Sequence, residues 1–434
     1  MGRRRRYILK NYDTPLVEFL VEEDAYKNLS CVVVEADRGA QNQFPVELLD
    51  AVEPTGESVL RWLSGRTIPK NRRFVDKILG YAGLGAGDVI GVIDLCKALS
   101  VNDAFWVAGT SDRADFGAVN LYDNELDEAL AVVAYTGHDS GQRRKLGLST
   151  EWTTSGQFPK AWRRIRGQLT LYKAGTEGFG NAGLEPYSEF FAAQIAAAMG
   201  VDAVGYDLDR WHGRLASTCV LMNDKDTALV PFYLAAGQSV FPRNLGAGAL
   251  VDGATFEMLR SMTVFDALIC NIDRHGANYG FLRDNKSGLF LGLAPLYDHN
   301  LSLFAYDTED DFAAWEDGSR ARALDPRTGT TTFDEQASFV MGELQHEQLR
   351  NLIGFELSNH PAHPVSERRL ASLNAYLAAR TKVLLRMPVV SSKAIARDFA
   401  ALLPSGERRP PAVALRAGCE KAPAAAHMRG ARRR

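Results

Sequence analysis

The sequence lacks the features that mark disulfide-bonded, zinc-binding, secreted and membrane-spanning proteins. Its five cysteines are scattered, and an odd count without a Cys-x-x-Cys pair argues against a disulfide framework and a zinc site. No apolar run approaches the roughly 20 residues that a membrane-spanning helix needs. Basic residues Arg3 to Arg6 are not followed by the apolar segment of a secretory signal. We therefore expect a cytoplasmic protein, with secretion as an effector left open.

The sequence also has little net charge. A formal charge of −3 gives no general reason to expect binding to nucleic acids or membranes. Hydrophobic residues make up 46% and charged residues 24%, as in ordinary globular proteins. A chain of 434 residues is too long for one typical core, so two or three compact units are expected. Pro, Ala, Gly and Arg dominate the last residues, which predicts a disordered basic tail over 401–434.

The first half of the chain is predicted to be rich in strands. Alternating apolar residues predict one or two strands over residues 7–23 and another over 28–37. Between residues 45 and 98 the apolar residues recur at helical spacing, which predicts short helices. Basic residues cluster there, and we interpret them as a solvated helix face, with a docking surface for a partner or a nucleic acid as the alternative. The cluster comprises Arg61, Arg66, Lys70, Arg72 and Arg73.

A segment rich in hydroxyl groups and glycine follows. Residues 148–162 are predicted to form two short strands joined at Ser155 and Gly156. Backbone N–H groups at such a tip can contact phosphate oxygens, although a plain exposed turn fits the local sequence equally well. The segment has neither the Gly-x-x-x-x-Gly-Lys-Ser/Thr motif of P-loops nor the Gly-x-Gly-x-x-Gly motif of typical protein kinases.

Two charged residues beyond this segment are candidates for nucleotide binding. Lys173 lies near the end of a predicted strand, where kinases keep the lysine that grips the α- and β-phosphates. Glu189 lies near the start of a predicted helix that begins at Pro186 and ends at Gly200. Glu189 could brace Lys173, or it could merely favour the positive helix end by about 0.3–1 kcal/mol. Both interpretations stay open.

The most informative stretch runs from Leu268 to Asp298. Asp273 and Asn278 have the spacing of the kinase catalytic loop, in which an Asp orients the attacking hydroxyl, and Asp298 takes the place of the metal-binding Asp that follows. A predicted helix over 256–270 leads to Asp273, and a predicted hairpin carries Asn278 at its start and Asp298 at its end. His275 is expected to form a hydrogen bond within the loop rather than to ligate a metal.

These elements predict an α+β, two-lobed, protein-kinase-like fold. We expect an accessory α/β region over 1–147, a strand-rich nucleotide-gripping lobe over 148–234 and a helical catalytic lobe over 235–400. The hinge between the lobes is expected near residues 230–234, where the pattern changes from mainly strands to mainly helices.

Two motifs resemble those of a known family. Asn271-Ile-Asp-Arg-His-Gly-Ala-Asn-Tyr-Gly280 and Ala294-Pro-Leu-Tyr-Asp298 are similar to the catalytic and metal motifs of HipA-like serine/threonine kinases. These are bacterial toxin-type kinases whose lobes resemble phosphatidylinositol 3/4-kinases. The resemblance covers roughly residues 7–390. Further segments resemble the CtkA-type sub-branch, namely residues 99–107, 153–160, 171–176 and 185–189.

The resemblance implies an ATP- and Mg²⁺-dependent kinase that acts on serine or threonine hydroxyls. By this resemblance, Asp273 would be the catalytic residue that faces the acceptor hydroxyl. Asn278 and Asp298 would hold Mg²⁺, and Lys173 would grip the nucleotide phosphates. Glu189 matches the pattern of the sub-branch.

The resemblance also assigns a role to the loop of residues 153–156. This loop would cover the nucleotide phosphates through residues such as Thr154, Ser155 and Gly156. HipA-like kinases can phosphorylate themselves in such a loop, so Thr153, Thr154 and Ser155 are all candidate acceptors. The loop departs from the family because it lacks the Ala-Gly-Ala-Gln-type motif of HipA.

The expected partners are a protein with a serine or threonine acceptor, the chain itself as one such acceptor, and an antitoxin-like regulator. Binding to a membrane or directly to nucleic acid is not expected, and a toxin role follows from the family alone. A small-molecule phosphotransferase is the alternative among enzymes because it can use the same Asp, Asn and Asp. A nucleotide-binding regulator without turnover is the alternative from another class.

Overall fold

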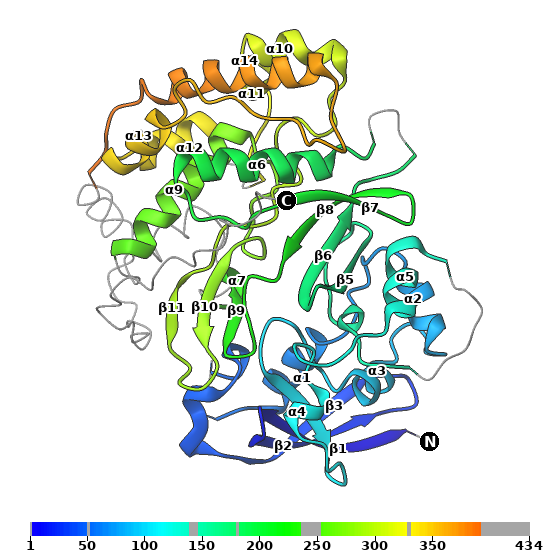
Figure 1. Ribbon diagram of the computed structural model, residues 1–434. Helices are drawn as coiled ribbons and strands as arrows, with labels where there is room; N and C mark the ends of the chain where they lie inside the picture. Colours follow the sequence, from blue (N-terminus) through cyan, green and yellow to red (C-terminus); the bar gives the residue numbers. More distant parts are fainter. Residues whose placement is uncertain are drawn as a thin grey trace, which may run out of the picture.

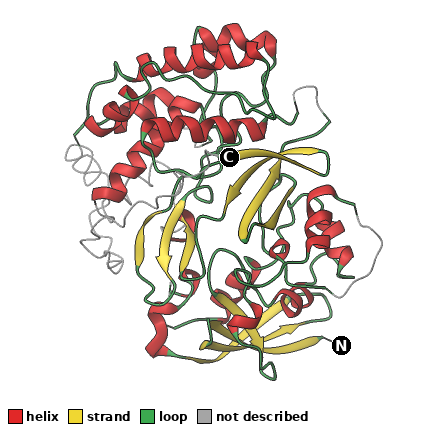
Figure 2. Cartoon of the chain, in the orientation of Figure 1, coloured by secondary structure: helices red, strands yellow, loops and turns green. Residues whose placement is uncertain are grey.

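The sheets and several short helices occupy one end of the molecule, and the longer helices gather at the other end (Figures 1 and 2). The computed structural model describes residues 2–49, 53–138, 146–178, 182–235, 253–327 and 331–391, and the statements below concern these ranges. The tail predicted over 401–434 lies outside the described residues. Within them, we find no helix with the length and apolar character needed to cross a membrane.

The first sheet is antiparallel, and its strands have the order β3-β2-β1-β4. The strands predicted over 7–23 and 28–37 are confirmed as a hairpin and its neighbour. Phe19 in this sheet shares a core with Trp62 and Ile93 of the helices α1 and α3. The four strands are β1 (Arg3–Asn11), β2 (Thr14–Glu23), β3 (Leu29–Ala36) and β4 (Phe105–Gly109).

Short helices follow, as the periodicity predicted. The N-terminus of α1 is closed by a capping box in which Thr55 and Ser58 exchange hydrogen bonds. Helices α2 and α5 share a small core with Trp152. The helices are α1 (Gly56–Ser64), α2 (Val75–Tyr81), α3 (Val89–Cys96), α4 (Phe116–Val119) and α5 (Glu128–Thr136), with 3₁₀ turns η1 (Arg38–Gln43) and η2 (Val46–Leu48) before them.

The basic cluster is only partly a solvated face. Arg66 is buried and donates to both oxygens of Asp103 at 3.0 and 2.6 Å. Arg72 is buried too, and it donates to Glu151 Oε2 at 2.6 Å and to the carbonyl of Lys160 at 2.8 Å. For these two arginines the surface interpretation is wrong, because each one is matched by a buried carboxylate far along the chain.

The second sheet has the antiparallel order β5-β6-β8-β7. The first of the two strands predicted in 148–162 is wrong, since η3 (Thr150–Trp152) is a 3₁₀ turn. There the Ser149 hydroxyl accepts from the N–H of Glu151, and the N–H groups of Thr153 and Thr154 donate to the carbonyl of Thr150. Such local bonds compete with strand pairing. The strands are β5 (Lys160–Ile165), β6 (Gln168–Ala174), β7 (Asp207–Trp211) and β8 (Arg214–Val220).

Side-chain packing crosses the expected domain boundary at residue 147. Ala131 and Tyr135 of α5 share a cluster with Ala161 of β5 and Tyr172 of β6. The accessory region therefore contributes to the core beneath the second sheet. The domain division stays a prediction.

The helical part of the molecule is built around α6 and α9. Helix α6 lies between the second sheet and the other helices (Figure 1), and its Phe191 and Ile195 share one core with Phe265, Leu268 and Tyr376. Gly200 ends α6 in a left-handed conformation with φ of 74°. The helices are α6 (Glu185–Met199), α7 (Phe232–Ala235), α9 (Gly253–Ile269), α10 (Phe312–Glu316), α11 (Ser319–Arg322), α12 (Phe333–Val340), α13 (Glu343–Arg350) and α14 (Glu367–Leu384), with η4 (Glu309–Asp311) before α10.

A third sheet, in the order β11-β10-β9, connects the second sheet with the helices. The hairpin predicted downstream of Asn278 is confirmed, and β10 pairs with both β9 and β11. Its strands are β9 (Thr227–Pro231), β10 (Gly280–Asp284) and β11 (Phe290–Leu293). This hairpin separates the loop that contains Asp273 from the loop that contains Asp298.

Candidate functional site

One ammonium group joins three distant parts of the chain. Lys173 Nζ, near the end of β6, donates to Glu189 Oε1 at 2.8 Å and to Asp298 Oδ1 at 2.5 Å. Lys173 and Glu189 are both buried, so the pairing that the sequence left open is present. Burial alone would lower the pKa of Lys173, but the carboxylates of Asp298 and Glu189 raise it overall. Lys173 is therefore protonated, and its two carboxylate partners hold it in position.

Asp298 is held in a restricted geometry. Its φ of 60° lies in the left-handed region, which is uncommon for residues other than glycine and is found at functional sites. Its N–H donates to the Tyr206 hydroxyl at 3.2 Å, and the next N–H, of His299, donates to Glu189 Oε2 at 3.0 Å. Burial would raise the pKa of Asp298, but Lys173 and then Lys160 lower it well below its usual range. Asp298 is therefore ionised.

A buried arginine orders the loop that contains Asp273 and Asn278. Arg274 donates to the carboxylate of Asp266 at 2.8 and 3.0 Å. The same guanidinium donates to the carbonyls of Asn278 and Tyr297, at 2.5 and 2.8 Å. One side chain thus places the Asn278 backbone beside the residue that precedes Asp298. Arg274 therefore orders this loop.

Asn278 folds back over its own loop. Its Nδ2 donates to the carbonyl of Asp273 at 2.9 Å, and within the described residues its amide oxygen accepts no hydrogen bond. His275 Nδ1 accepts from the N–H of Ala277 at 3.2 Å, as expected for a histidine that stabilises the loop. Burial lowers the pKa of His275, so it is mainly neutral near pH 7. Mg²⁺ prefers oxygen ligands, and the Asn278 amide oxygen and the Asp298 carboxylate are of that type.

The carboxylate of Asp273 contacts an arginine from a later loop. Asp273 Oδ1 accepts a hydrogen bond from Arg327, which lies between α11 and α12. Sequence reasoning did not select Arg327, and nothing local could have done so, because 54 residues separate the two side chains. An acceptor hydroxyl that approached Asp273 would meet this guanidinium as well.

The three candidate acceptor hydroxyls lie in different environments. Thr153 Oγ1 donates to the carbonyl of Leu99 at 3.0 Å, and Thr154 Oγ1 donates to that of Thr150 at 2.8 Å. Ser155 is exposed, and its hydroxyl has no hydrogen bond to any residue that the structure describes. The structure thus distinguishes Ser155 from the two threonines, which the sequence could not do.

Lys160 is a second lysine at the site, and sequence reasoning did not single it out. It lies directly opposite Lys173 in the β5–β6 register, so both side chains emerge on the same face of the sheet. Gly156, at φ of 99°, passes so close that a Cβ there would collide with Lys160 Nζ. Burial, and then Lys173, lower the pKa of Lys160 to about 7. Its position only four residues after Gly156, the last residue of the phosphate-loop candidate, was the available signal.

Asp266 is a third residue that sequence reasoning missed, after Arg327 and Lys160. It is buried on α9 and holds both Arg274 and, through Oδ1, the Asn271 amide at 2.9 Å. A carboxylate inside the apolar sequence Val-Phe-Asp-Ala-Leu was the available signal, since such a residue is seldom buried without a cationic partner.

Comparisons with known proteins bear on the fold of the chain. No protein-family model matches the sequence, and no curated protein matches it. Among solved structures, HipA of the Shewanella oneidensis MR-1 toxin–antitoxin system, in complex with HipB and operator DNA, matches with a TM-score of 0.52 at 15% identity. The match covers 87% of this chain and 97% of HipA. The chain has a HipA-type kinase fold.

A second solved structure is the Helicobacter pylori proinflammatory kinase CtkA. It matches with a TM-score of 0.40 at 17% identity, over 56% of this chain and 94% of CtkA. At such identities the likeness to HipA shows the fold alone. It bears out the predicted mixed α/β, kinase-like architecture, whereas the roles of the individual site residues stay predictions.

Removing Lys173 should destabilise the protein more than removing Lys173 and Glu189 together. Lys173→Met leaves Glu189 buried beside Asp298 without a cation, at a cost of about 3–5 kcal/mol. Adding Glu189→Leu removes the uncompensated carboxylate and should restore part of that stability. Guanidinium unfolding followed by tryptophan fluorescence measures the difference, and the exposed Lys382→Met serves as control. A double variant no more stable than Lys173→Met would contradict this account of the ion pairs.

Proposed function

We propose that this protein is an ATP- and Mg²⁺-dependent kinase of serine or threonine hydroxyls, of the HipA-like type. The observation that carries the proposal is the single ammonium of Lys173, which binds both Glu189 and Asp298. Protein kinases require such a Lys–Glu pair together with a metal-binding Asp. The Arg274 guanidinium, which links the Asn278 and Tyr297 carbonyls, supports the proposal because it holds the two expected ligand loops together.

Each residue of the site has a distinct task in the proposed reaction. Asp273 would orient the acceptor hydroxyl and accept its proton while the γ-phosphoryl group moves to the hydroxyl oxygen and ADP leaves. Lys173 would exchange its contact with Asp298 for the nucleotide phosphates and keep Glu189 as its brace. Bound Mg²⁺, held by Asn278 and Asp298, would neutralise phosphate charge. The ionised state of Asp298 suits that ligand role.

Asp273→Asn should reduce transfer of the γ-phosphoryl group from ATP by at least about a thousandfold, since the amide cannot accept the hydroxyl proton. Asp298→Asn should do the same through weaker metal binding. Intact-mass detection of self-phosphorylation, run beside a screen of small-molecule acceptors, gives the measurement. The exposed Lys382→Met serves as control.

The outcomes separate the proposal from its alternatives. Undiminished incorporation in both variants would refute the assigned roles. Transfer to a small molecule alone would identify a small-molecule phosphotransferase. Tight ATP binding with neither hydrolysis nor transfer would identify a regulator without turnover.

We further propose Ser155 as the acceptor of self-phosphorylation. Its hydroxyl is exposed, whereas those of Thr153 and Thr154 are engaged with backbone carbonyls. Ser155→Ala should abolish the mass increase of one phosphoryl group, and Thr154→Val should retain it. Peptide mapping that placed the phosphate on Thr153 or Thr154 would contradict the choice.

Nucleotide affinity should depend on the protonation of Lys160. An anion beside Lys160 favours the ammonium form, so binding takes up a proton near the pKa of about 7. Between about pH 6 and pH 8 the free amine becomes dominant, and the Kd for ATP should rise by about tenfold. Lys160→Arg keeps a charged side chain and should remove this increase. The nucleotide's own ionisation is common to both proteins, so identical pH profiles in calorimetric titrations would exclude the role of Lys160.

We extend the proposal to an antitoxin-like protein regulator. HipA in the solved complex is bound together with HipB and operator DNA. A toxin role for this chain follows only from that parallel, and slower growth with the wild type than with Asp273→Asn would support it.

A further inference from the structure

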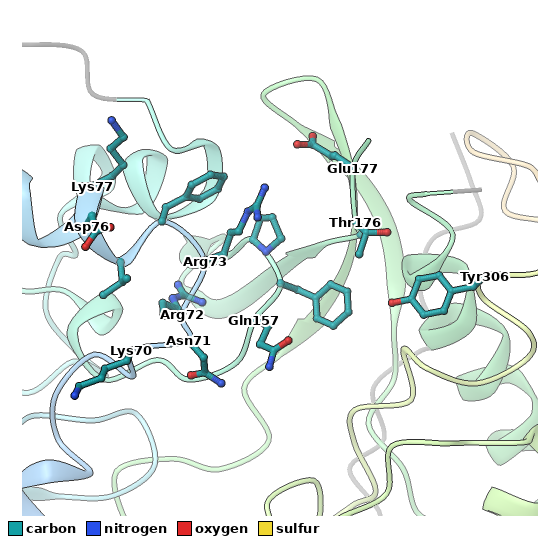
Figure 3. Close-up of a pocket in the computed structure, with 15 residues that line it drawn as sticks. Lys70, Asn71, Arg72, Arg73, Asp76, Lys77, Gln157, Thr176, Glu177 and Tyr306 are labelled. Atoms are coloured by element: carbon teal, nitrogen blue, oxygen red, sulfur yellow. The ribbon is translucent and has the colours of Figure 1, made fainter. Parts of the chain in front are cut away.

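A cavity lies beside the candidate site, outside the ion-paired centre. It encloses about 790 Å³, within the roughly 300–1,000 Å³ typical of ligand pockets. Its walls come from the segment Lys70–Lys77 that leads into α2, the turn Gln157–Pro159 and the residues that follow β6 (Figure 3). Tyr306, eight residues after Asp298, faces this cavity from the helical part of the molecule. Four parts of the chain therefore meet there.

The cavity carries an excess of positive charge. Lys70, Arg73 and Lys77 are exposed along one wall, and none of them forms an ion pair with any residue that the structure describes. The buried Arg72 is matched by Glu151, and Glu177 is matched by Arg214 at 2.8 Å. Asp76 is the one remaining carboxylate among the described lining residues. A concave surface with cations of one sign attracts and retains anions.

The cavity also adjoins the groups expected to react. Phe158 lines it, and the Phe158 ring centroid lies 5.8 Å from Lys173 Nζ. Burial raises the pKa of Tyr306, and the carboxylates of Glu185 and Asp273 raise it further. Neither Lys173 nor Asp273 nor Asp298 lines the cavity. An occupant would therefore lie next to the nucleotide and the acceptor hydroxyl without taking their place.

We propose that this groove, lined by Lys70, Arg73, Lys77, Phe158 and Tyr306, docks an acidic segment of the protein acceptor next to the hydroxyl that is phosphorylated. The inference rests on the proposed kinase function and adds a substrate preference to it. The cations would pair with Asp or Glu side chains of the segment, and the two aromatic rings would pack against its backbone and stems. A nucleic acid fits less well, because the cations line one concavity rather than an extended track.

Peptide binding tests the groove without requiring catalysis. The probe is a fluorescein-labelled serine peptide flanked by glutamates, with a matched peptide flanked by glutamines. Fluorescence anisotropy with the full-length chain should show tighter, salt-sensitive binding of the glutamate peptide. Reversing three charges with Lys70→Glu, Arg73→Glu and Lys77→Glu together should weaken its binding by about tenfold.

A matched control variant excludes a general charge effect. Arg350→Glu, Lys382→Glu and Arg386→Glu together change the net charge equally at exposed positions on and after α13 and α14. This variant should bind the glutamate peptide as the wild type does. Equal affinity of the wild type for both peptides, no measurable binding of either, or equal losses in the two triple variants would overturn the inference. Displacement of the peptide by oligothymidylate at lower concentrations than by unlabelled peptide would also overturn it, by assigning the groove to nucleic acid.

Phosphorylation of the same peptides separates this inference from the proposed function. Groove-dependent binding of the glutamate peptide, with no phosphoryl transfer from ATP to any acceptor, would contradict the kinase function and leave the docking groove supported. Transfer to both peptides with equal kcat/KM in the wild type would support the kinase function and overturn the groove.

Discussion

The arrangement of the site depends on the sharing of one buried ammonium between two carboxylates. Lys173 belongs to a strand, Glu189 to the helix that packs into the other half of the molecule, and Asp298 to the loop after the third sheet. If either carboxylate moved away from Lys173, that carboxylate would lose the cation that compensates its charge. The three elements therefore constrain one another. The contact of Glu189 with the His299 N–H extends this constraint to the backbone beside Asp298. These ion pairs, together with apolar packing, therefore fix the relative position of the two halves.

A second fixed point, Arg274, organises the other side of the site. Its guanidinium binds Asp266, two backbone carbonyls and His299 Nδ1 at 3.0 Å. A planar group with several donors can do this because each N–H points in a set direction. The polar loops near Asp273 and Asp298 therefore need no regular secondary structure of their own to be held in place. Fold alone does not name a substrate, which is why the side chains around the site carry the functional argument.

Much of this architecture was predictable from local pattern, and the failures have two physical causes. Strand and helix periodicity gave the elements that carry Lys173, Glu189 and Asp298, because each pattern reflects which face of an element is buried. Periodicity failed at Thr150–Trp152, where hydroxyl groups bond to nearby backbone. Periodicity also could not predict the burial of Arg66 and Arg72, because their acidic partners lie 37 and 79 residues away. Long-range pairing of charges is a property of the folded chain and leaves no local trace.

The buried pair of Arg72 and Glu151 determines how the molecule can be divided. Both side chains are fully inaccessible, and Arg72 also satisfies the carbonyl of Lys160 at the start of β5. A fragment that began after residue 145 would keep Glu151 and lose the guanidinium that compensates it. The N-terminal region therefore packs as part of the structure around the second sheet rather than as a detachable module. In a chimaera with a relative, the segments around Arg72 and Glu151 would have to come from the same parent, although one strand and four helices of the described chain lie between them.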